Sequence, residues 1–125
     1  MFSMANANQP WGDCIVVGIK DAPMLDSVNF LPDPPVAGQP VQFNISASLN
    51  TATNMYSNLV TAFQSDAGII YNMDVYRLDK NLSEVNLTRT VEAFHSLPAN
   101  HVISVNIVDM NSGDSYGCVS FTRTG

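Results

Sequence analysis

The chain has 125 residues, a length that suits one domain with its own hydrophobic core. Charged residues make up 13% of it, about half the usual share, and the formal net charge at pH 7 is −6. Disordered chains are rich in charge and poor in apolar residues, so this composition argues against disorder. The basic residues are few and scattered, which excludes nucleic-acid binding through a Lys/Arg footprint. They are Lys20, Arg77, Lys80, Arg89 and Arg123.

Apolar and polar residues alternate along several short stretches, which is the period-two pattern of half-buried β-strands. The clearest example is Gln39–Leu49, and Ile69–Tyr76 alternates in the same way. The predicted strands, in chain order, are Ile15–Ile19, Ser27–Leu31, Gln39–Leu49, Asn58–Gln64, Ile69–Tyr76, Leu87–Ala93, Val102–Asp109 and Tyr116–Thr122.

Turn-forming residues separate these stretches. The run Pro32–Pro35, followed by Gly38, cannot form a helix or a central strand, because proline lacks an N–H donor and fixes φ. Asp66–Gly68 joins two apolar runs closely enough for a hairpin, and Asn111–Asp114 is typical of a second hairpin tip. Seven or eight short strands with no helix between them predict an all-β antiparallel sandwich or barrel in a single domain.

The two cysteines, Cys14 and Cys118, lie near opposite ends of the chain. They could be two buried thiols, or a disulfide that ties the first predicted strand to the last. Closing a loop of about 100 residues contributes roughly 4–5 kcal/mol in the chain-entropy model. N-glycosylation sequons begin at Asn44, Asn81 and Asn86. Few charges, many Asn, Ser and Thr, and these sequons favour an extracellular or lumenal compartment, where disulfides persist.

The sequence contains no motif that indicates a metal site or a catalytic centre, and we expect neither enzymatic activity nor a cofactor. His95 and His101 flank a proline without a nearby cysteine, which is not the pattern of zinc ligands. No Gly-x-Ser-x-Gly elbow occurs. Asp109 and Asp114 lie beside a predicted turn, where aspartate commonly bonds the local backbone.

Several motifs occur in a recognisable order along the chain. Asp13-Cys14 opens a short apolar strand, and Val28–Gly38 (VNFLPDPPVAG) leads into the alternating strand from Gln39. Later, Leu97–His101 (LPANH) precedes another alternating strand, and Ser112–Phe121 (SGDSYGCVSF) follows it. This order resembles the ML lipid-recognition family, which includes the Niemann–Pick lysosomal sterol carrier, fungal phosphatidylglycerol/phosphatidylinositol transfer proteins and mite group 2 allergens.

The resemblance implies an immunoglobulin-like sandwich of about seven or eight strands over residues 13–125, after an N-terminal extension of residues 1–12. It implies an apolar cavity between the two antiparallel sheets. In this family the first and last cysteines pair, which corresponds to Cys14 and Cys118. The family's two inner disulfides have no counterpart in this chain.

The implied function is that of a soluble lipid-binding and lipid-transfer protein holding a sterol or phospholipid between its sheets. Such a protein would be a monomer in a secreted or lysosomal/vacuolar lumen. It would contact a membrane transiently or pass its lipid to a lipid-accepting membrane protein.

We expect the apolar sets of the alternating strands to line the cavity, with a mouth near Pro34–Pro35 or Phe94–Leu97. The expected lining residues are Val41, Phe43, Ile45, Leu59, Phe63, Ile69, Tyr71, Met73, Val75, Ile103, Val105 and Ile107. The many methionines and phenylalanines suit an adaptable cavity, but composition alone favours an ordinary packed core.

The alternative is a non-enzymatic structural or adhesion sandwich that binds protein or carbohydrate on its outer surface. It predicts a solid core and an exposed aromatic patch involving Trp11, Tyr56 or Tyr76. The usual immunoglobulin signature is missing, because Trp11 precedes Cys14 instead of lying between the two cysteines.

Overall fold

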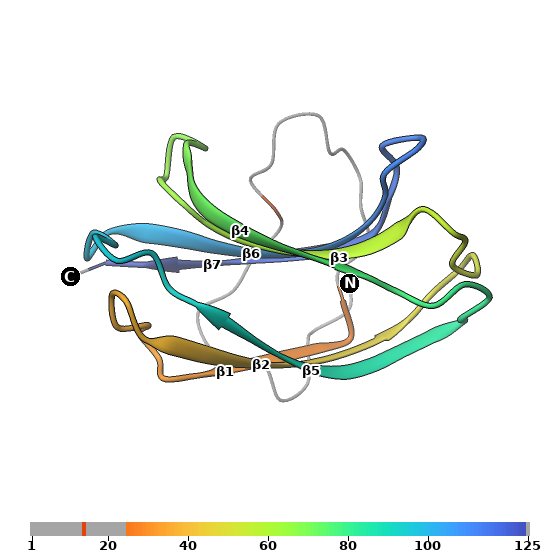
Figure 1. The fold of residues 1–125 in the computed structure, drawn as a ribbon, viewed down its shortest axis with the longest axis horizontal. Coiled ribbons are helices and arrows are strands. Elements are labelled where there is room, and N and C mark those ends of the chain that lie inside the picture. Colours follow the sequence, from red (N-terminus) through yellow and green to blue (C-terminus); the bar gives the residue numbers. More distant parts are fainter. Residues whose placement is uncertain (1–13, 15–24, 125) are drawn as a thin grey trace.

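The computed structural model describes Cys14 and residues 25–124, and within this part of the chain all regular structure is β. Figure 1 shows two layers of strands packed face to face. The strands are β1 (Ser27–Leu31), β2 (Pro40–Ser48), β3 (Ser57–Gln64), β4 (Ile70–Arg77), β5 (Glu84–Glu92), β6 (His101–Asp109) and β7 (Ser115–Arg123). No helix of the described residues is long and apolar enough to cross a membrane.

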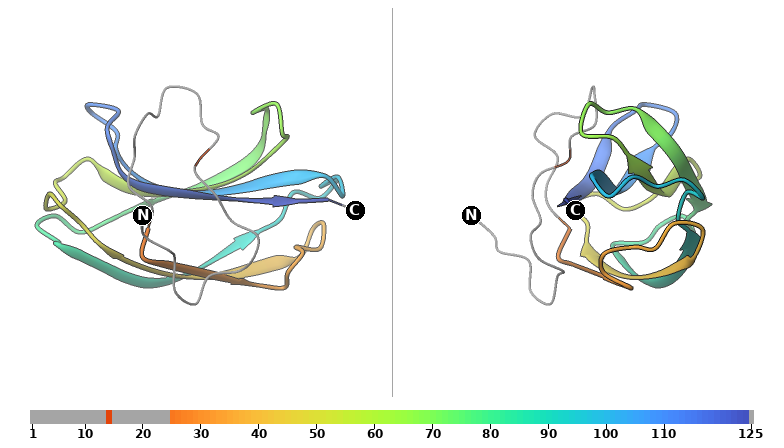
Figure 2. Two further views of the ribbon diagram at one scale, coloured as in Figure 1. Left: turned by 180° about the vertical axis from the view of Figure 1, so that it is seen from behind. Right: turned by 90° about the vertical axis from the view of Figure 1, so that its left-hand side faces the viewer.

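One layer is a three-stranded sheet of order β1-β2-β5, and the other is a four-stranded sheet of order β4-β3-β6-β7. Every pairing is antiparallel, and Figure 2 shows the sandwich from behind and end-on. This two-sheet, immunoglobulin-like arrangement confirms the predicted fold class. The predicted strand Ser27–Leu31 is β1, and six others match β2–β7 within a few residues at each end. The predicted strand Ile15–Ile19 lies outside the described residues.

The alternation read from the sequence places one face of each central strand in the core. On β2, Val41, Phe43 and Ile45 are buried, whereas Gln42 and Asn44 are exposed. Because side chains alternate between the two faces of a strand, the polar set lies on the outer face of the three-stranded sheet. The apolar set contacts the inner face of the other sheet.

Four phenylalanines form the centre of this core, and all are at most 1% exposed. Phe30 packs 5.6 Å from Phe43 and 5.0 Å from Phe121, measured between ring centroids. Phe43 lies 6.4 Å from Phe63. These tilted and edge-on contacts join both sheets, since the rings come from β1, β2, β3 and β7.

The prediction for β4 was wrong about which face points inward. Ile69, Met73 and Val75 are exposed by 66%, 48% and 47%. Tyr71 is half-buried and stacks on Phe94 at 5.6 Å. A period-two pattern shows that residues alternate without showing which set faces the core, and a shift of one residue exchanges the two faces. The β3–β4 register shifts at Phe63/Gln64, and β4 is an edge strand that can expose apolar side chains.

The inward positions of β4 are polar or aromatic. Antiparallel partners share a face of the sheet, and the register pairs Phe63 with Asn72, Thr61 with Asp74, and Leu59 with Tyr76. Leu59 and Phe63 belong to the core, so their partners on β4 also face the space between the sheets. Because the inner face of β4 is the opposite of the predicted one, hydrogen-bonding groups lie along this edge of the sandwich.

The predicted hairpins are confirmed. β3 pairs with β4 across Asp66–Gly68, and β6 pairs with β7 across Asn111–Asp114. Gly68 has φ 89° and Gly113 has φ 83°, a region that glycine occupies without the steric cost of a Cβ. Glycine at these two positions therefore allows both turns to form without steric strain.

A disulfide joins Cys14 to Cys118 on β7, as predicted. Val119 and Phe121 on the same strand belong to the core, so Cys118 lies on the outer face of the four-stranded sheet. The bond therefore attaches Cys14 to that outer face, across a sequence separation of 104 residues.

Candidate functional site

The edge of the sandwich between β4 and β5 is joined by charged side chains. Arg89 on β5 donates from Nε to Asp74 Oδ2 at 2.7 Å and from Nη2 to Asp74 Oδ1 at 3.0 Å. The guanidinium also lies 4.6 Å from the ring centroid of Tyr76. Its side chain is 33% exposed and that of Asp74 is 24% exposed. This cluster, here called the β4–β5 latch, connects the two sheets.

Hydrogen bonding within the latch favours its charged form. The bond that Arg89 donates to Asp74 raises the pKa of Arg89 above its usual value, and the nearby negative charge acts in the same direction. Arg89 pairs with Phe43 in the β2–β5 ladder, so the arginine starts from the inner face of its sheet. The latch is therefore a bidentate ion pair over the rim of the core.

A second polar link lies beside the latch. The Asn72 side chain donates from Nδ2 to the backbone carbonyl of Glu92 at 2.9 Å. Asn72 belongs to β4 and Glu92 ends β5, so this bond also crosses between the sheets. Polar contacts thus hold this edge closed at two points.

Two polar atoms of this region are buried without a hydrogen-bond partner among the described residues. They are Thr61 Oγ1 on β3 and Asn72 Oδ1 on β4. Thr61 is fully buried and lies between Leu59 and Phe63 along the inner face of its strand. Most buried polar groups in proteins are hydrogen-bonded, so two such atoms close together require an explanation.

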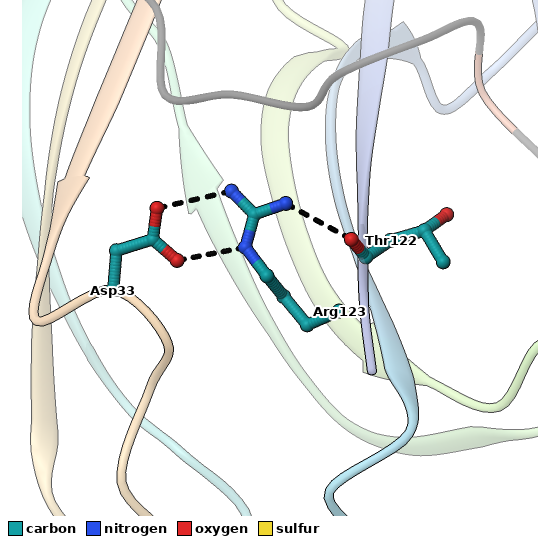
Figure 3. A network of polar contacts seen from close by, with 3 residues as sticks. All are labelled: Asp33, Thr122 and Arg123. Carbon is teal, nitrogen blue, oxygen red and sulfur yellow. Dashed lines mark hydrogen bonds and ion pairs between the residues drawn. The ribbon is translucent and has the colours of Figure 1, made fainter. Parts of the chain in front are cut away.

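The opposite edge, between β1 and β7, has a related contact that is more deeply buried. Arg123 on β7 donates to both carboxylate oxygens of Asp33, with Nε–Oδ1 and Nη2–Oδ2 distances of 2.7 and 3.1 Å (Figure 3). Its Nη1 bonds the Thr122 carbonyl at 2.9 Å. The guanidinium lies 5.3 Å from the Phe30 ring centroid and 5.7 Å from that of Phe121. The Arg123 side chain is only 8% exposed, so this edge is fixed against the aromatic core.

The predicted lining residues divide into two groups. Eight lie in the buried core: Val41, Phe43, Ile45, Leu59, Phe63, Ile103, Val105 and Ile107. The other four lie on or beside β4 and do not line the interior, as described above for Ile69, Tyr71, Met73 and Val75. The loops considered for the mouth lie side by side, because Gly38 donates its N–H to the carbonyls of Ala93 and Phe94.

Prediction from the sequence missed the polar members of this edge. The expected lining consisted of apolar side chains only. It therefore did not include the polar residues Thr61, Asn72, Asp74 and Arg89. The sequence could have indicated Thr61, because this polar residue occupies the inward position between Leu59 and Phe63. The partnership of Asp74 with Arg89 could not be read in the same way, because it depends on which face of β4 points inward.

The sequon asparagines are exposed and lie on two different structures. Asn44 and Asn86 are on the outer face of the three-stranded sheet, where Asn44 Oδ1 accepts from Thr88 at 2.7 Å and Asn86 Oδ1 accepts from Ser46 at 2.6 Å. Asn86 is therefore part of β5, which begins three residues before the predicted strand Leu87–Ala93. Asn81 lies in the β4–β5 loop with φ 65°.

A polar surface cleft of about 350 Å³ lies at the end of the sandwich that carries the β6–β7 turn. Asp109 is one of the residues that line it, and the pKa of this carboxylate is lowered by hydrogen bonds, first from the Asn54 side chain and then from the Ser112 and Asn111 backbone. The Asn54–Asp109 bond is 2.8 Å long. Ser115 and Tyr116 in the cleft are also hydrogen-bonded, to Asn106 and Ser57. These polar groups hold the turn in place.

A scan of the chain against protein-family models finds no matching family, and a search of curated proteins finds no match either.

Proposed function

We propose that the protein binds a lipid between its two sheets and transfers it between membranes or membrane proteins. One observation carries this proposal. The interior is apolar, and the β4–β5 edge is closed by an ion pair and a hydrogen bond beside the stacked rings of Tyr71 and Phe94. The two polar contacts can exchange their protein partners for water when this edge opens. The resemblance to the ML family supports the same function.

The energetics of lipid burial favour such an opening. Each buried CH₂ group contributes about 0.8 kcal/mol, so a ten-carbon chain supplies roughly 8 kcal/mol. A partly exposed ion pair contributes about 1 kcal/mol or less. The apolar gain therefore exceeds the cost of breaking the Arg89–Asp74 contact several-fold, and the remainder is available to separate the sheets.

The outer side of β4 offers a contact for the donor or acceptor of the lipid. Ile69, Ile70, Met73 and Val75 are each at least 47% exposed, and Met73 and Val75 flank Asp74 of the latch along the strand. A soluble protein seldom exposes neighbouring large apolar side chains without a partner. The net charge of −6 disfavours strongly anionic bilayers, so the proposed contact is with a neutral bilayer or a lipid-accepting membrane protein.

The proposed compartment is a secreted or lysosome-like lumen. The Cys14–Cys118 disulfide is consistent with an oxidising environment, and the three sequons are exposed enough to accept glycans.

The test is direct detection of a bound lipid. Purified protein is incubated with vesicles of mixed neutral lipids and phospholipids, separated from them, and examined by native mass spectrometry. The expected result is a lipid adduct in one-to-one ratio, together with lipid transfer from labelled to unlabelled vesicles. Protein that takes up no lipid and accelerates no transfer contradicts the proposal.

The second candidate function is that of an adhesion or structural sandwich that binds protein or carbohydrate on its outer surface. The contacting ring cluster of Phe30, Phe43, Phe63 and Phe121 favours it, because these rings fill the centre of the core. Tyr56 and Tyr76 are 45% and 40% exposed, whereas Trp11 lies outside the described residues. Binding to a glycan array that Tyr56→Ala abolishes, in protein that takes up no lipid, would support this function instead.

A further inference from the structure

We propose that Thr61 and Asn72 form a recognition site for the hydroxyl group of an uncharged lipid alcohol, placed between the sheets at the β4–β5 edge. This inference rests on the proposed lipid-binding function and specifies the chemical class of ligand. It starts from the two buried polar atoms that have no protein partner among the described residues, Thr61 Oγ1 and Asn72 Oδ1.

The two side chains lie close enough to share one ligand group. Thr61 is paired with Asp74 across β3 and β4, and Asn72 is two residues from Asp74 on the same strand face. Such diagonal neighbours have Cα atoms roughly 7–8 Å apart, and their side-chain tips can approach the same small group. Both face the space between the sheets, because their strand neighbours Leu59 and Phe63 do so.

The orientation of Asn72 is fixed by its second polar atom. Its Nδ2 already donates to the Glu92 carbonyl at 2.9 Å, which leaves Oδ1 as an acceptor only. The Thr61 hydroxyl can donate one hydrogen bond and can also accept. A ligand group that bonds both atoms therefore donates to Asn72 Oδ1 and accepts from Thr61 Oγ1. An alcohol hydroxyl does both.

Charged head groups fit this pair poorly. A phosphate or carboxylate is an anion that would lie beside the Asp74 carboxylate, and a phosphate diester or carboxylate also has no hydrogen to donate to Asn72 at neutral pH. An ammonium group could donate to both atoms, but Asp74 is already neutralised by Arg89 in a bidentate pair. The added charge would then be buried without a counterion, which is strongly unfavourable.

The latch supplies the route to this site. Asp74 is the direct partner of Thr61 and the anchor of Arg89, so withdrawal of Arg89 uncovers the inner face of β3 and β4 at this point. The apolar part of the ligand then lies against Leu59 and Val105, the inner-face neighbours of Thr61 along β3 and across to β6. The hydroxyl remains beside the edge through which it entered.

The experiment compares four ligands of equal chain length: decanol, decyl methyl ether, decyl phosphate and decylamine. Their dissociation constants are measured by displacement of a fluorescent apolar reporter from the full-length, disulfide-bonded protein. The ether retains an acceptor oxygen but cannot donate to Asn72. We expect the wild-type protein to bind decanol about tenfold more tightly than the ether, the ratio that corresponds to one good hydrogen bond.

Four variants assign this preference to the site. Asn72→Leu has a similar shape without the acceptor that only decanol can use, and it should reduce the preference for decanol over the ether to within about twofold. Thr61→Val removes the donor from which both ligands accept, so it should weaken the binding of both and leave the preference in place. Thr61→Ser keeps the hydroxyl and should bind both ligands as the wild type does. Thr90→Val makes the same Thr-to-Val substitution on the exposed outer face of β5 and should change neither affinity nor preference. Thermal melting of each variant shows that it is folded.

The outcomes separate this inference from the proposed function. If all four ligands bind equally, lipid binding stands and the hydroxyl site is refuted. Tighter binding of decyl phosphate or decylamine than of decanol refutes it as well, and so does an unchanged preference in Asn72→Leu or an unchanged affinity for decanol in Thr61→Val. If no ligand displaces the reporter, both the site and the lipid-binding function fail.

Discussion

Arg89 and Asp74 join the two sheets through a bidentate ion pair at the β4–β5 edge, where both side chains are partly open to solvent. Arg123 and Asp33 form the same type of pair at the β1–β7 edge, but Arg123 is nearly buried against two phenylalanine rings. The same bidentate arginine–aspartate pair thus occurs once with a partly exposed arginine and once with a nearly buried one. Solvent screening weakens the first pair and leaves the second largely intact.

This difference predicts unequal effects of two matched substitutions. Arg89→Met should lower the free energy of unfolding by about 1 kcal/mol or less, because the pair is partly exposed. Arg123→Met should cost about 3 kcal/mol, because it removes a guanidinium whose side chain is only 8% exposed and which contacts both Asp33 and two phenylalanine rings. Urea unfolding of both variants measures the two values. An Arg89 variant as unstable as the Arg123 variant would show that the β4–β5 edge is not the weaker one.

Arg89→Met should also admit apolar ligands faster. If the latch limits entry to the interior, its removal increases the association rate of a fluorescent apolar reporter in stopped-flow measurements. Arg77→Met is the control, because Arg77 lies on the same edge strand as Asp74 but bonds the Met55 carbonyl instead of crossing to the other sheet. Equal rates in the wild-type protein and the Arg89 variant would place the entrance elsewhere.

Substitution of the outward-facing Met73 on β4 should affect stability far less than substitution of the buried Ile103 on β6. Met73→Ala should change stability by no more than about 0.5 kcal/mol, since the side chain is 48% exposed. Ile103→Ala should cost about 2–5 kcal/mol, because it removes a fully buried side chain from the core. Chemical denaturation provides both values of the change in stability.

In the transfer assay, Met73→Lys should slow lipid delivery to neutral vesicles while leaving the bound lipid in place.

The disulfide should account for a large part of the stability. Reduction removes the constraint on a separation of 104 residues, which contributes roughly 4–5 kcal/mol in the chain-entropy model. The melting temperature should therefore fall markedly with reductant and in Cys14→Ser. The double variant Cys14→Ser, Cys118→Ser serves as the control, because its melting curve should not respond to reductant. A wild-type curve that reductant leaves unchanged would contradict this prediction.

Asp109 should contribute to stability only above acidic pH. Its pKa is lowered in the folded protein by the hydrogen bonds from Asn54 and the turn backbone. A group with a lowered folded-state pKa stabilises fully above its unfolded pKa of about 3.9, and this contribution is lost as pH falls through the folded-state pKa. Asp109→Asn should therefore be less stable than the wild type at pH 7, with a difference that shrinks below about pH 4. Melting temperatures across this pH range test it, and a constant difference would refute the assignment.

Strand positions could be predicted well from this sequence because alternation and turn residues act locally. The Asp66–Gly68 and Asn111–Asp114 turns were identified by their chemistry, and β1 was placed at its observed bounds. The facing of β4 could not be predicted from the alternation, because its more apolar set, with Ile69, Met73 and Val75, is the set that faces outward on this edge strand. Only the register with β3 decides which set faces inward, and that register depends on an irregularity at Phe63/Gln64.

The candidate site depends on the same long-range information. The eight core residues of the predicted lining were found because burial of apolar side chains is the dominant signal in the sequence. The pairing of Asp74 with Arg89 joins different sheets, and nothing local in either strand indicates it. The Thr61–Asn72 pair follows only after the inner face of β4 is known.

Asn44 and Asn86 lie on the outer face of the three-stranded sheet, whereas Met73 and Val75 lie on the outer face of the four-stranded sheet. A glycan attached to either asparagine would project from one broad side of the molecule and leave the other bare. The protein would then approach any other surface in one orientation, with its sugar-bearing side turned to water.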